Sequence, residues 1–324
     1  MRNVRRVIGA IIAIAALSIC AFAQNSGSFT GTIKDSVGGV IPGAAVTVFE
    51  QATALRQVTT TNAEGNFVFP QLPAGTYTIT AEAKGFKKSE NTGIVLSVAT
   101  RVSLGDIVLE VGSITDTITV EANPGTIQIQ ADSGERSDVL TNRDIREIAL
   151  NGQNIIDMMK FIPGVNVSAL VANAASTVTN ITGSFQVNGT RSLEHEYTLD
   201  GITNLNLGNN TGALVSVNPD ALEEVKVLTS NYQAEYGRSG GGVIALTTRG
   251  GTNEYHGGAR YFRRHDSMNA NSYFNDLRGG QGTYSRPLYR YNFYGWDFGG
   301  PVYIPHVVNG KNKLFFFMSQ EYYS

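Results

Sequence analysis

A serine flanked by glycines is the pattern in this sequence with the most direct link to chemistry. Gly237, Ser239 and Gly241 have the G-x-S-x-G spacing of a nucleophile elbow, in which a sharp turn from a strand into a helix exposes the serine. The following run, VIALTT over 243–248, is rich in β-branched residues and predicts a strand in place of that helix. We therefore predict no catalytic site at Ser239 and expect the glycines to serve backbone packing.

Histidines are the next candidates, because they could bind metals. The chain has four histidines, at His195, His256, His265 and His306. They lack the spacing of a metal-binding helix or zinc finger, so we expect no metal site. His195, between Glu194 and Glu196, could bind a cation, but we expect a solvated turn. The sequence also shows neither a P-loop nor a Rossmann fingerprint, so we predict no cofactor. An active process would then need a partner to supply its energy.

The N-terminus predicts a secretory signal peptide over residues 1–23. Arginines at 2, 5 and 6 precede an apolar run, 7–19, that is shorter than the roughly 20 residues needed to span a bilayer. Ala21-Phe22-Ala23 then supplies a cleavage site. Cys20 is the one cysteine and lies inside this peptide, so the mature chain should have neither disulfides nor thiol chemistry.

Composition favours a turn-rich β protein without a nucleic-acid partner. The chain has 36 glycines and 16% charged residues. Its formal net charge of -2 gives no basic field that would attract nucleic acid. Beyond the N-terminus no apolar run has the length of a membrane helix, so insertion in a membrane would require a β barrel.

Residues 24–112 alternate short strands with glycine and proline turns. About seven strands at this spacing predict a small β sandwich, with strands expected over 29–35, 44–50, 56–62, 66–72, 76–83, 93–99 and 105–111. The blocks GTIKDSVGGVIPGAAVTV and TTTNAEGNFVFPQLPAGTYTITAEAKGF resemble the carboxypeptidase regulatory-like domain, a transthyretin-like sandwich also grouped with carbohydrate-binding-like folds. This resemblance implies a fold and no catalytic activity.

Residues 113–124 are polar and β-prone, and two interpretations fit them. The segment could be an interdomain linker bounded by Gly112 and Pro124. Alternatively, it could be a strand kept available to pair with the sheet edge of another protein.

Residues 125–249 mix helices and strands in the pattern of a compact α+β domain. Short helices are expected over 144–147 and 154–161, the second with an apolar stripe that should be buried: Ile155, Met158, Met159 and Ile162. Turns are expected at Asn188-Gly189 and Asp200-Gly201, and residues 221–224 could begin one turn of helix. The loop over 205–214 could contact a ligand, although we expect a flexible loop.

Residues 250–324 are aromatic and arginine-rich, as membrane β strands are. In EYHGGARYFRR one face carries Tyr255, Gly257, Ala259 and Tyr261, and the opposite face carries His256, Gly258 and Arg260. Such alternation suits a strand with lipid on one side and water on the other. The segments RYNFYGWDFGG and KLFFFMSQEYYS are further candidates, with poorer alternation but suitable girdle aromatics.

Several blocks together resemble the N-terminal part of the TonB-dependent outer-membrane transporters, of the Oar-like kind. They are LNGQNIIDMMKFIPGV, FQVNGTRSLEHEYTLDG, EEVKVLTSNYQAEYGRSGGGVIALTTRGGTNEYHG and NGKNKLFFF. The resemblance implies a mainly β chain: a regulatory-like sandwich, an α+β plug domain, and the first strands of an incomplete transmembrane β barrel. It implies an outer-membrane protein with periplasmic N-terminal domains, contacts with lipid, and a gate for energy-dependent uptake of a small-molecule or oligosaccharide ligand.

The resemblance also implies roles for particular residues. Part of the linker is similar to a TonB box, which would pair as a strand with TonB, a protein energised by its inner-membrane partners. The residues of this box would be Asp116, Thr117, Ile118, Thr119, Val120, Glu121 and Ala122. Packing of plug against barrel and the hinge between them would involve Tyr232, Tyr236, Arg238, Gly240, Gly241, Gly242, Gly250 and Gly251. We expect no catalytic residues, and the ligand-binding residues stay open.

The chain departs from the family pattern in length, because two or three membrane strands cannot close a barrel. We expect a fragment of a longer product, with a truncated product as the other possibility. An alternative function is a periplasmic or surface module that binds carbohydrate or protein without transport. The transported ligand cannot be assigned from these residues.

Overall fold

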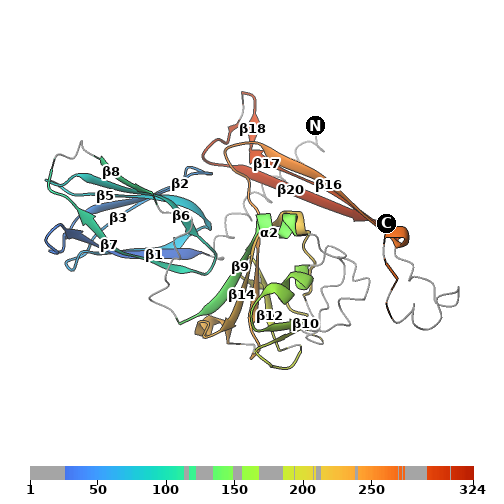
Figure 1. Cartoon of the computed structure of the whole chain (residues 1–324). Helices are drawn as coiled ribbons and strands as arrows, with labels where there is room; N and C mark the ends of the chain where they lie inside the picture. The colour runs from blue at the N-terminus through green and yellow to red at the C-terminus, as the bar shows by residue number, and fades with distance from the viewer. Residues whose placement is uncertain are drawn as a thin grey trace.

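Three bodies of β structure follow one another along the chain (Figure 1). The computed structural model describes residues 26–112, 117–121, 134–148, 155–167, 185–192, 194–206, 208, 213–237, 240–268, 270–271, 273, 290–306 and 308–324. The predicted signal peptide, Asp116, Ala122, Arg238 and Ser239 lie outside these residues. The predictions made for them are therefore untested.

The first body is the predicted sandwich of two sheets. One sheet has the order β4-β1-β7, built from β1 (Gly27–Asp35), β4 (Asn66–Leu72) and β7 (Arg101–Leu109). The other has the order β3-β2-β5-β6-β8, built from β2 (Ala45–Glu50), β3 (Arg56–Thr60), β5 (Gly75–Glu82), β6 (Lys88–Leu96) and β8 (Thr117–Glu121). Between the sheets lies an apolar core that includes Phe29, Ile33, Phe67, Tyr77 and Ile79. The seven strands predicted for this domain are confirmed, and β8 adds to them.

Two sandwich strands begin earlier than the sequence predicted. Strands were expected to start at Gly93 and Gly105, yet β6 starts at Lys88 and β7 at Arg101. Both glycines have positive φ, 76° and 64°, and lie where the pairing register shifts. They are bulges inside strands, because glycine reaches such φ values without steric cost.

The second body is the predicted α+β domain. Its five-stranded sheet has the order β13-β12-β15-β14-β9, with β9 (Arg136–Thr141), β12 (Glu196–Leu199), β13 (Ile202–Thr203), β14 (Leu222–Ser230) and β15 (Val243–Thr248). Strands β10 (Val165–Val167) and β11 (Phe185–Val187) form a separate two-stranded antiparallel sheet. The central strand β15 is paired on both sides, parallel to β12 and antiparallel to β14. Four consecutive residues of β15 are buried, as expected for a strand covered on both faces.

The helices of this domain agree with the predictions in place but not in every detail. Helix α2 (Asn142–Glu147) begins with a capping box between Thr141 and Asp144. The second helix is a 3₁₀ helix, η3 (Ile155–Phe161), whose predicted apolar stripe is buried. The turn of helix expected over 221–224 is wrong: 3₁₀ helix η4 (Pro219–Ala221) precedes it, and β14 starts at Leu222. Proline favours the first turn of a helix, whereas LEEVKV pairs with β9 and β15.

The third body is an antiparallel sheet of β16 (His256–His265), β17 (Arg290–Pro301) and β20 (Phe315–Tyr323). Between β17 and β20 lies a small hairpin of β18 (Tyr303–Ile304) and β19 (Val308–Asn309). The alternation predicted for β16 is confirmed, because Gly257, Ala259 and Tyr261 are exposed and their neighbours are less so. Strand β17 alternates more cleanly than its sequence indicated, with Tyr294 and Trp296 outward and Asp297 buried.

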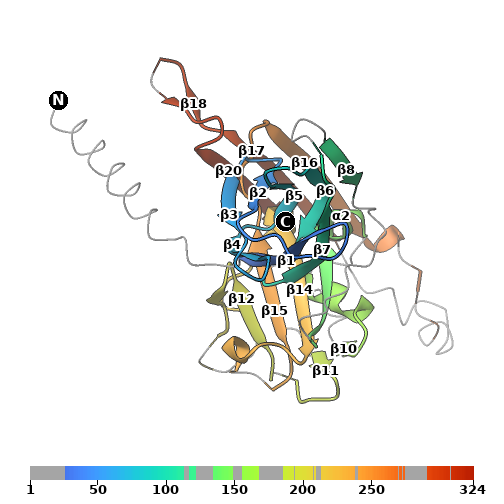
Figure 2. The ribbon, with the colours of Figure 1, turned by 90° about the vertical axis from the view of Figure 1, so that its left-hand side faces the viewer.

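The two ribbon views agree on how the bodies meet (Figures 1 and 2). The sheet of the second body lies below β16, β17 and β20, with helix α2 on the side that faces them. The sandwich contacts the link between plug and barrel strands, where the Asn253 amide donates to the Ala52 carbonyl at 2.9 Å. Asn253 Oδ1 in turn accepts from the Asn312 amide at 2.7 Å. Within the described residues, no helix is long and apolar enough to cross a membrane.

Candidate functional site

The predicted partner-binding segment forms an edge strand. Residues Thr117–Glu121 are extended as β8 and pair in parallel with β6. The register joins Lys88 to Thr117 and continues without a shift to Thr92 and Glu121. The sheet therefore ends at β8, and this segment is not an irregular linker.

Downstream of this segment, a buried lysine fastens the start of the plug. Lys226 Nζ, on β14, lies 2.7 Å from Glu135 Oε1, and these side chains are 1% and 4% exposed. The ammonium also donates to the Ala99 carbonyl at 2.9 Å and to Thr100 Oγ1 at 3.1 Å, both on a loop of the sandwich. Because a buried ammonium needs such partners, Lys226 joins plug, linker end and sandwich at one point.

Glu224 makes a second contact between the same two domains. Its Oε1 accepts from the Val98 amide of the sandwich loop at 2.6 Å. Burial raises the pKa of Glu224, while the Val98 hydrogen bond and the nearby Lys226 oppose that rise. The sandwich is therefore docked on the plug sheet through buried polar contacts.

A network of six charged groups joins the plug to the barrel strands. Arg146, Asp220 and Arg249 come from the plug side, and Arg260, Asp297 and Glu321 come from β16, β17 and β20. Arg260 is central, with Nε 2.5 Å from Asp220 Oδ2 and Nη2 3.1 Å from Glu321 Oε1. Asp297 accepts from Arg146 at 2.7 Å and from Arg249 at 3.2 Å. The three cations offset these three anions, and Arg249 Nε also lies 3.5 Å from Oε2 of the more exposed Glu223, so each buried carboxylate has a cationic partner.

Burial and the neighbouring guanidiniums have opposite effects on the pKa of Asp220. Burial raises the pKa of the Asp220 carboxyl, and the guanidiniums of Arg260 and Arg146 act against that rise. The backbone holds the residue in place, because the Asp220 amide donates to Asn218 Oδ1 at 3.0 Å. Asn218 Nδ2 also donates to Ser319 Oγ of β20 at 2.6 Å. Helix η4 is thus a main contact between plug and barrel strands.

Three of the predicted hinge and packing glycines have a steric reason to be glycine. A Cβ on Gly241 would lie 2.7 Å from the Glu194 carbonyl oxygen. A Cβ on Gly251 would collide with the Phe316 and Gly300 backbones, so only glycine lets the hinge approach the barrel strands this closely. Gly242 has φ of 127° and would place a Cβ 3.0 Å from the Leu228 carbonyl oxygen. Gly250 has no neighbour within 4 Å of its Cβ position, so its role in the hinge stays a prediction.

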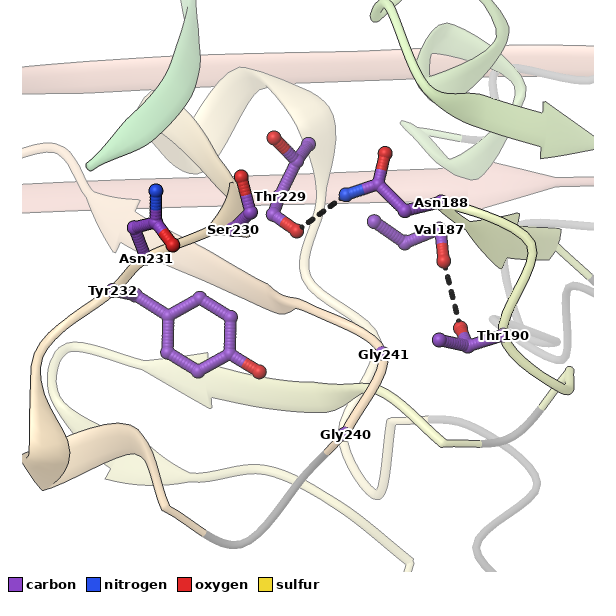
Figure 3. A pocket seen from close by; sticks show the side chains of 9 residues that line it. All are labelled: Val187, Asn188, Thr190, Thr229, Ser230, Asn231, Tyr232, Gly240 and Gly241. Atoms are coloured by element: carbon purple, nitrogen blue, oxygen red, sulfur yellow. Dashed lines mark hydrogen bonds between the residues drawn. The ribbon is translucent and has the colours of Figure 1, made fainter. Parts of the chain in front are cut away.

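Tyr232 and Tyr236 lie at the end of β14 that is distant from η4 and the barrel strands. Their rings meet edge to face, with centroids 6.4 Å apart. Tyr232 lines an open cavity of about 310 Å³ together with Gly240 and Gly241, and its side chain points toward them (Figure 3). The cavity wall includes Asn188, whose Nδ2 donates to the Thr229 carbonyl at 2.8 Å. These residues are brought together, but whether they pack against a barrel stays a prediction.

The expectation of a solvated turn at His195 is wrong. This side chain is 2% exposed and stacks on Phe185, with ring centroids 4.0 Å apart and planes at 21°. Tyr197 meets it edge to face at 5.2 Å. Among the described residues, Nε2 has no hydrogen-bond partner, and burial lowers the pKa of His195 to about 4. His195 is therefore a neutral core residue, consistent with its place just before buried strand β12.

The residues that could have suggested chemistry do not assemble a catalytic or metal site in the part of the chain described. The G-x-S-x-G stretch leads into strand β15 and not into the helix that an elbow requires. No group of three or more potential metal-ligating side chains occurs among the described residues. Asp200, predicted to cap a turn, accepts from the Thr248 amide at 2.9 Å and from Thr248 Oγ1 at 2.8 Å.

Sequence reasoning missed the charged groups that fasten the plug. Lys226 interrupts an apolar strand, and Asp297 lies in the aromatic run YGWDFGG of a membrane strand candidate. A charge in either setting needs a partner and is a recognisable signal. The partners themselves, such as Glu135 and Arg146, come from residues at least 48 positions away, and no local pattern identifies them.

Three domain families match consecutive parts of the chain. They are the carboxypeptidase regulatory-like domain over 28–110, the TonB-dependent receptor plug domain over 130–244, and an outer membrane beta barrel domain over 247–324. The TonB-dependent transporter Oar of Myxococcus xanthus is 29% identical over 277 residues. That alignment covers 79% of this chain and 24% of the relative, so the chain spans about a quarter of that protein.

Solved structures of outer-membrane proteins are also similar in part. The siderophore receptor PirA from Acinetobacter baumannii is 20% identical with a TM-score of 0.40, over 58% of this chain and 24% of that one. The outer membrane transporter YddB from Escherichia coli is 21% identical with a TM-score of 0.37, over 52% and 24% of the two chains.

Proposed function

The chain belongs to the TonB-dependent receptors of the outer membrane, and from this premise we propose that its whole protein takes up a ligand with energy delivered by TonB. The plug would close a barrel to which β16, β17 and β20 contribute. The ligand would be a small molecule or an oligosaccharide that arrives from outside the cell. We propose no enzymatic activity for the chain.

The observation that carries this proposal is the position of β8. Residues Thr117–Glu121 form an extended strand at a sheet edge, and the plug strand β9 begins only 15 residues after it. An extended segment with backbone groups at an edge suits capture by strand addition, which needs little from the side chains. A pull on β8 would reach the plug through a short stretch of chain.

The plug is held so that it could act as a gate. The network of Arg146, Asp220 and Arg249 with Arg260, Asp297 and Glu321 fixes it to the barrel strands. Water that enters between these groups can solvate their charges and so offset the desolvation cost of burial, whereas an apolar contact would lose its stabilisation. We infer that the plug rearranges by hydrating this network when TonB pulls.

The outer face of the barrel strands supports contact with lipid. Tyr261, Tyr294 and Tyr322 lie side by side on that face, and the last two stack at 5.3 Å. All three are more than 40% exposed. Aromatic rows of this kind suit the border between headgroups and hydrocarbon.

The test is capture of the purified periplasmic domain of TonB by the full-length protein carrying Val120→Pro. Proline removes a backbone donor and restricts φ, so we expect capture to fall by at least about tenfold. Val120→Thr is the matched control, because threonine keeps a β-branched side chain and the backbone donor, and it should bind as the wild type does. Equal capture by the proline and wild-type proteins would show that TonB does not use this strand.

A further inference from the structure

A row of polar residues lies beyond Tyr261, Tyr294 and Tyr322 on the outward face of the barrel strands. Because successive side chains of a strand point to opposite faces, Arg263 of β16 shares the outward face with Tyr261. The strand partner of Arg263 is Asn292 of β17, and the Tyr261 hydroxyl donates to Asn292 Oδ1 at 2.8 Å. Tyr261 thus turns its hydroxyl toward the polar row, as a tyrosine at the border between hydrocarbon and headgroups does.

This polar row lies at the end of the barrel strands that faces away from the periplasm. The opposite end carries the hinge, where the Asn253 amide donates to the Ala52 carbonyl of the sandwich. Figure 1 shows the C-terminus, which follows β20, at the end of these strands distant from the sandwich. The protein is an outer-membrane receptor with its plug on the periplasmic side, so the polar row lies at the level of the outer leaflet.

Two arginines meet on this outward face. Arg290 lies opposite His265, two positions beyond the partner of Arg263, so the two arginines are diagonal neighbours on β16 and β17. Diagonal neighbours of this kind are about 7–8 Å apart, which is within reach of long side chains. Both arginines are exposed. A small group held between their guanidiniums would therefore touch both of them.

The charge around this pair of arginines is positive. Residues 261–268 and 290–294 contain three arginines and one aspartate. That aspartate is Asp266, whose Oδ1 lies 2.7 Å from Arg290 Nε. The contact uses Nε, so the two terminal nitrogens of the Arg290 guanidinium can still donate to an anion. Arg263 lies opposite the neutral Asn292, so the pair keeps a positive charge for an anion from outside the chain.

We propose that Arg263 and Arg290 bind the phosphate of a phosphorylated glycolipid in the outer leaflet. Guanidinium groups match phosphate oxygens through bidentate hydrogen bonds. A phosphomonoester carries about −1.5 to −2 charges at pH 7, so it suits two cations better than a singly charged phosphodiester does. Asn292 and Ser324, which exchange backbone hydrogen bonds beside the pair, are neutral polar residues that suit sugar hydroxyls. This site goes beyond the proposed function, because it does not depend on TonB or on uptake of a ligand.

The experiment measures binding of diphosphoryl lipid A, a glycolipid with two phosphomonoesters, to the purified full-length protein in detergent micelles. Native mass spectrometry over a range of lipid concentrations gives the dissociation constant. Arg263→Gln with Arg290→Gln should weaken binding by at least about tenfold, because it removes both charges and both guanidiniums. Both side chains are exposed, so the substitutions should leave the folded protein intact.

The matched control is Lys311→Gln with Lys313→Gln. It also removes two exposed positive charges, but it does so beside the start of β20, at the hinge end of the same sheet. Its binding of lipid A should equal that of the wild type. An equal loss in this control and in the arginine variant would show that binding follows total charge, and the site would be wrong.

Two further probes identify the source of the phosphate. Phosphatidylglycerol, a phosphodiester lipid, should bind the wild type at least about fivefold more weakly than lipid A does. Inorganic phosphate at the concentration of the lipid should not displace lipid A, because burial of acyl chains against the outward tyrosines adds to its affinity.

Each contrary result overturns a stated part of the proposal. Equal binding of lipid A by the arginine variant and the wild type would show that these arginines form no lipid site. Equal affinity for phosphatidylglycerol would contradict the glycolipid assignment, and displacement by inorganic phosphate would show an anion site without a role for lipid. None of these results bears on TonB capture, which Val120→Pro tests separately.

Discussion

Strands β8 and β9 precede and follow one stretch of the chain, and they are held in different ways. Strand β8 has five residues, paired on one side with β6 of the sandwich. Strand β9 has six residues, paired with β14 of the plug, and Glu135 beside it forms a buried ion pair with Lys226 at 2.7 Å. Opening β8 breaks its backbone pairing with β6, whereas opening β9 also separates Glu135 from Lys226, whose buried ammonium then keeps only the neutral acceptors at Ala99 and Thr100. Both are edge strands, so the buried contact of Glu135 with Lys226 is what distinguishes the attachment of β9 from that of β8.

The largest expected effect comes from removing the attachment of β9. Lys226→Met leaves Glu135 buried without its cation and removes the donors to Ala99 and Thr100. We expect the free energy of opening β9 to fall by about 3–5 kcal/mol, as for other broken buried pairs. Hydrogen exchange of the β9 amides in the purified full-length protein measures this, as an increase of at least roughly 100-fold.

Lys160→Met is the matched control for this variant, since Lys160 belongs to the same domain and is exposed. It should change exchange of the β9 amides little, by an amount equivalent to at most about 0.5 kcal/mol. If Lys226→Met behaves like this control, β9 is held by its backbone pairing alone and the contrast with β8 disappears.

A drop in pH should lower the free energy of unfolding of the plug, which contains β9, and leave that of the sandwich, which pairs with β8, unchanged. His195 in the plug core has a folded-state pKa of about 4, below the ordinary value of 6.5. The unfolded state therefore binds the proton first, and stability that is fully present above pH 6.5 is lost as pH falls toward 4. At pH 5 the expected loss is about 2 kcal/mol for the plug. The sandwich segment, 24–112, contains no histidine.

Hydrogen exchange of the two domains at pH 7 and pH 5, corrected for the intrinsic rates, measures this difference. His195→Phe should abolish the pH dependence assigned to this group, because phenylalanine can keep the stack on Phe185 without a titrating nitrogen. Equal loss of protection in the sandwich and the plug, unchanged in the variant, would contradict the assignment.

The smallest effect is expected for a charge near β8. Lys88 lies on β6 at the start of the pair, and its Nζ is 3.8 Å from Glu82 and 3.7 Å from Glu90. These partners belong to the sandwich and are partly exposed, so Lys88→Gln should cost at most about 0.5 kcal/mol. Exchange of the β8 amides should stay within about twofold of the wild type. A large increase would mean that charge, and not backbone pairing, holds β8.

The main features of each body can be predicted from local sequence patterns. Alternating residues and glycine turns fixed the seven strands of the sandwich, because a strand with one buried face must repeat every two residues. The same reasoning gave the membrane alternation of β16 and the strand after Ser239. The extended nature of Thr117–Glu121 was also one of two readings of its composition, and the structure has it as a strand.

The partners that these elements take are seen only in the folded chain. Nothing local to Thr117–Glu121 shows that it pairs with Lys88–Thr92, since any open sheet edge offers the same backbone groups. Nothing near Lys226 in the sequence indicates Glu135 or Ala99, and nothing near Glu194 and Glu196 shows that His195 is buried against Phe185. The physical reason is that hydrophobic periodicity depends on the nearest residues, whereas the free energy of a buried charge or ring depends on groups that only folding brings near.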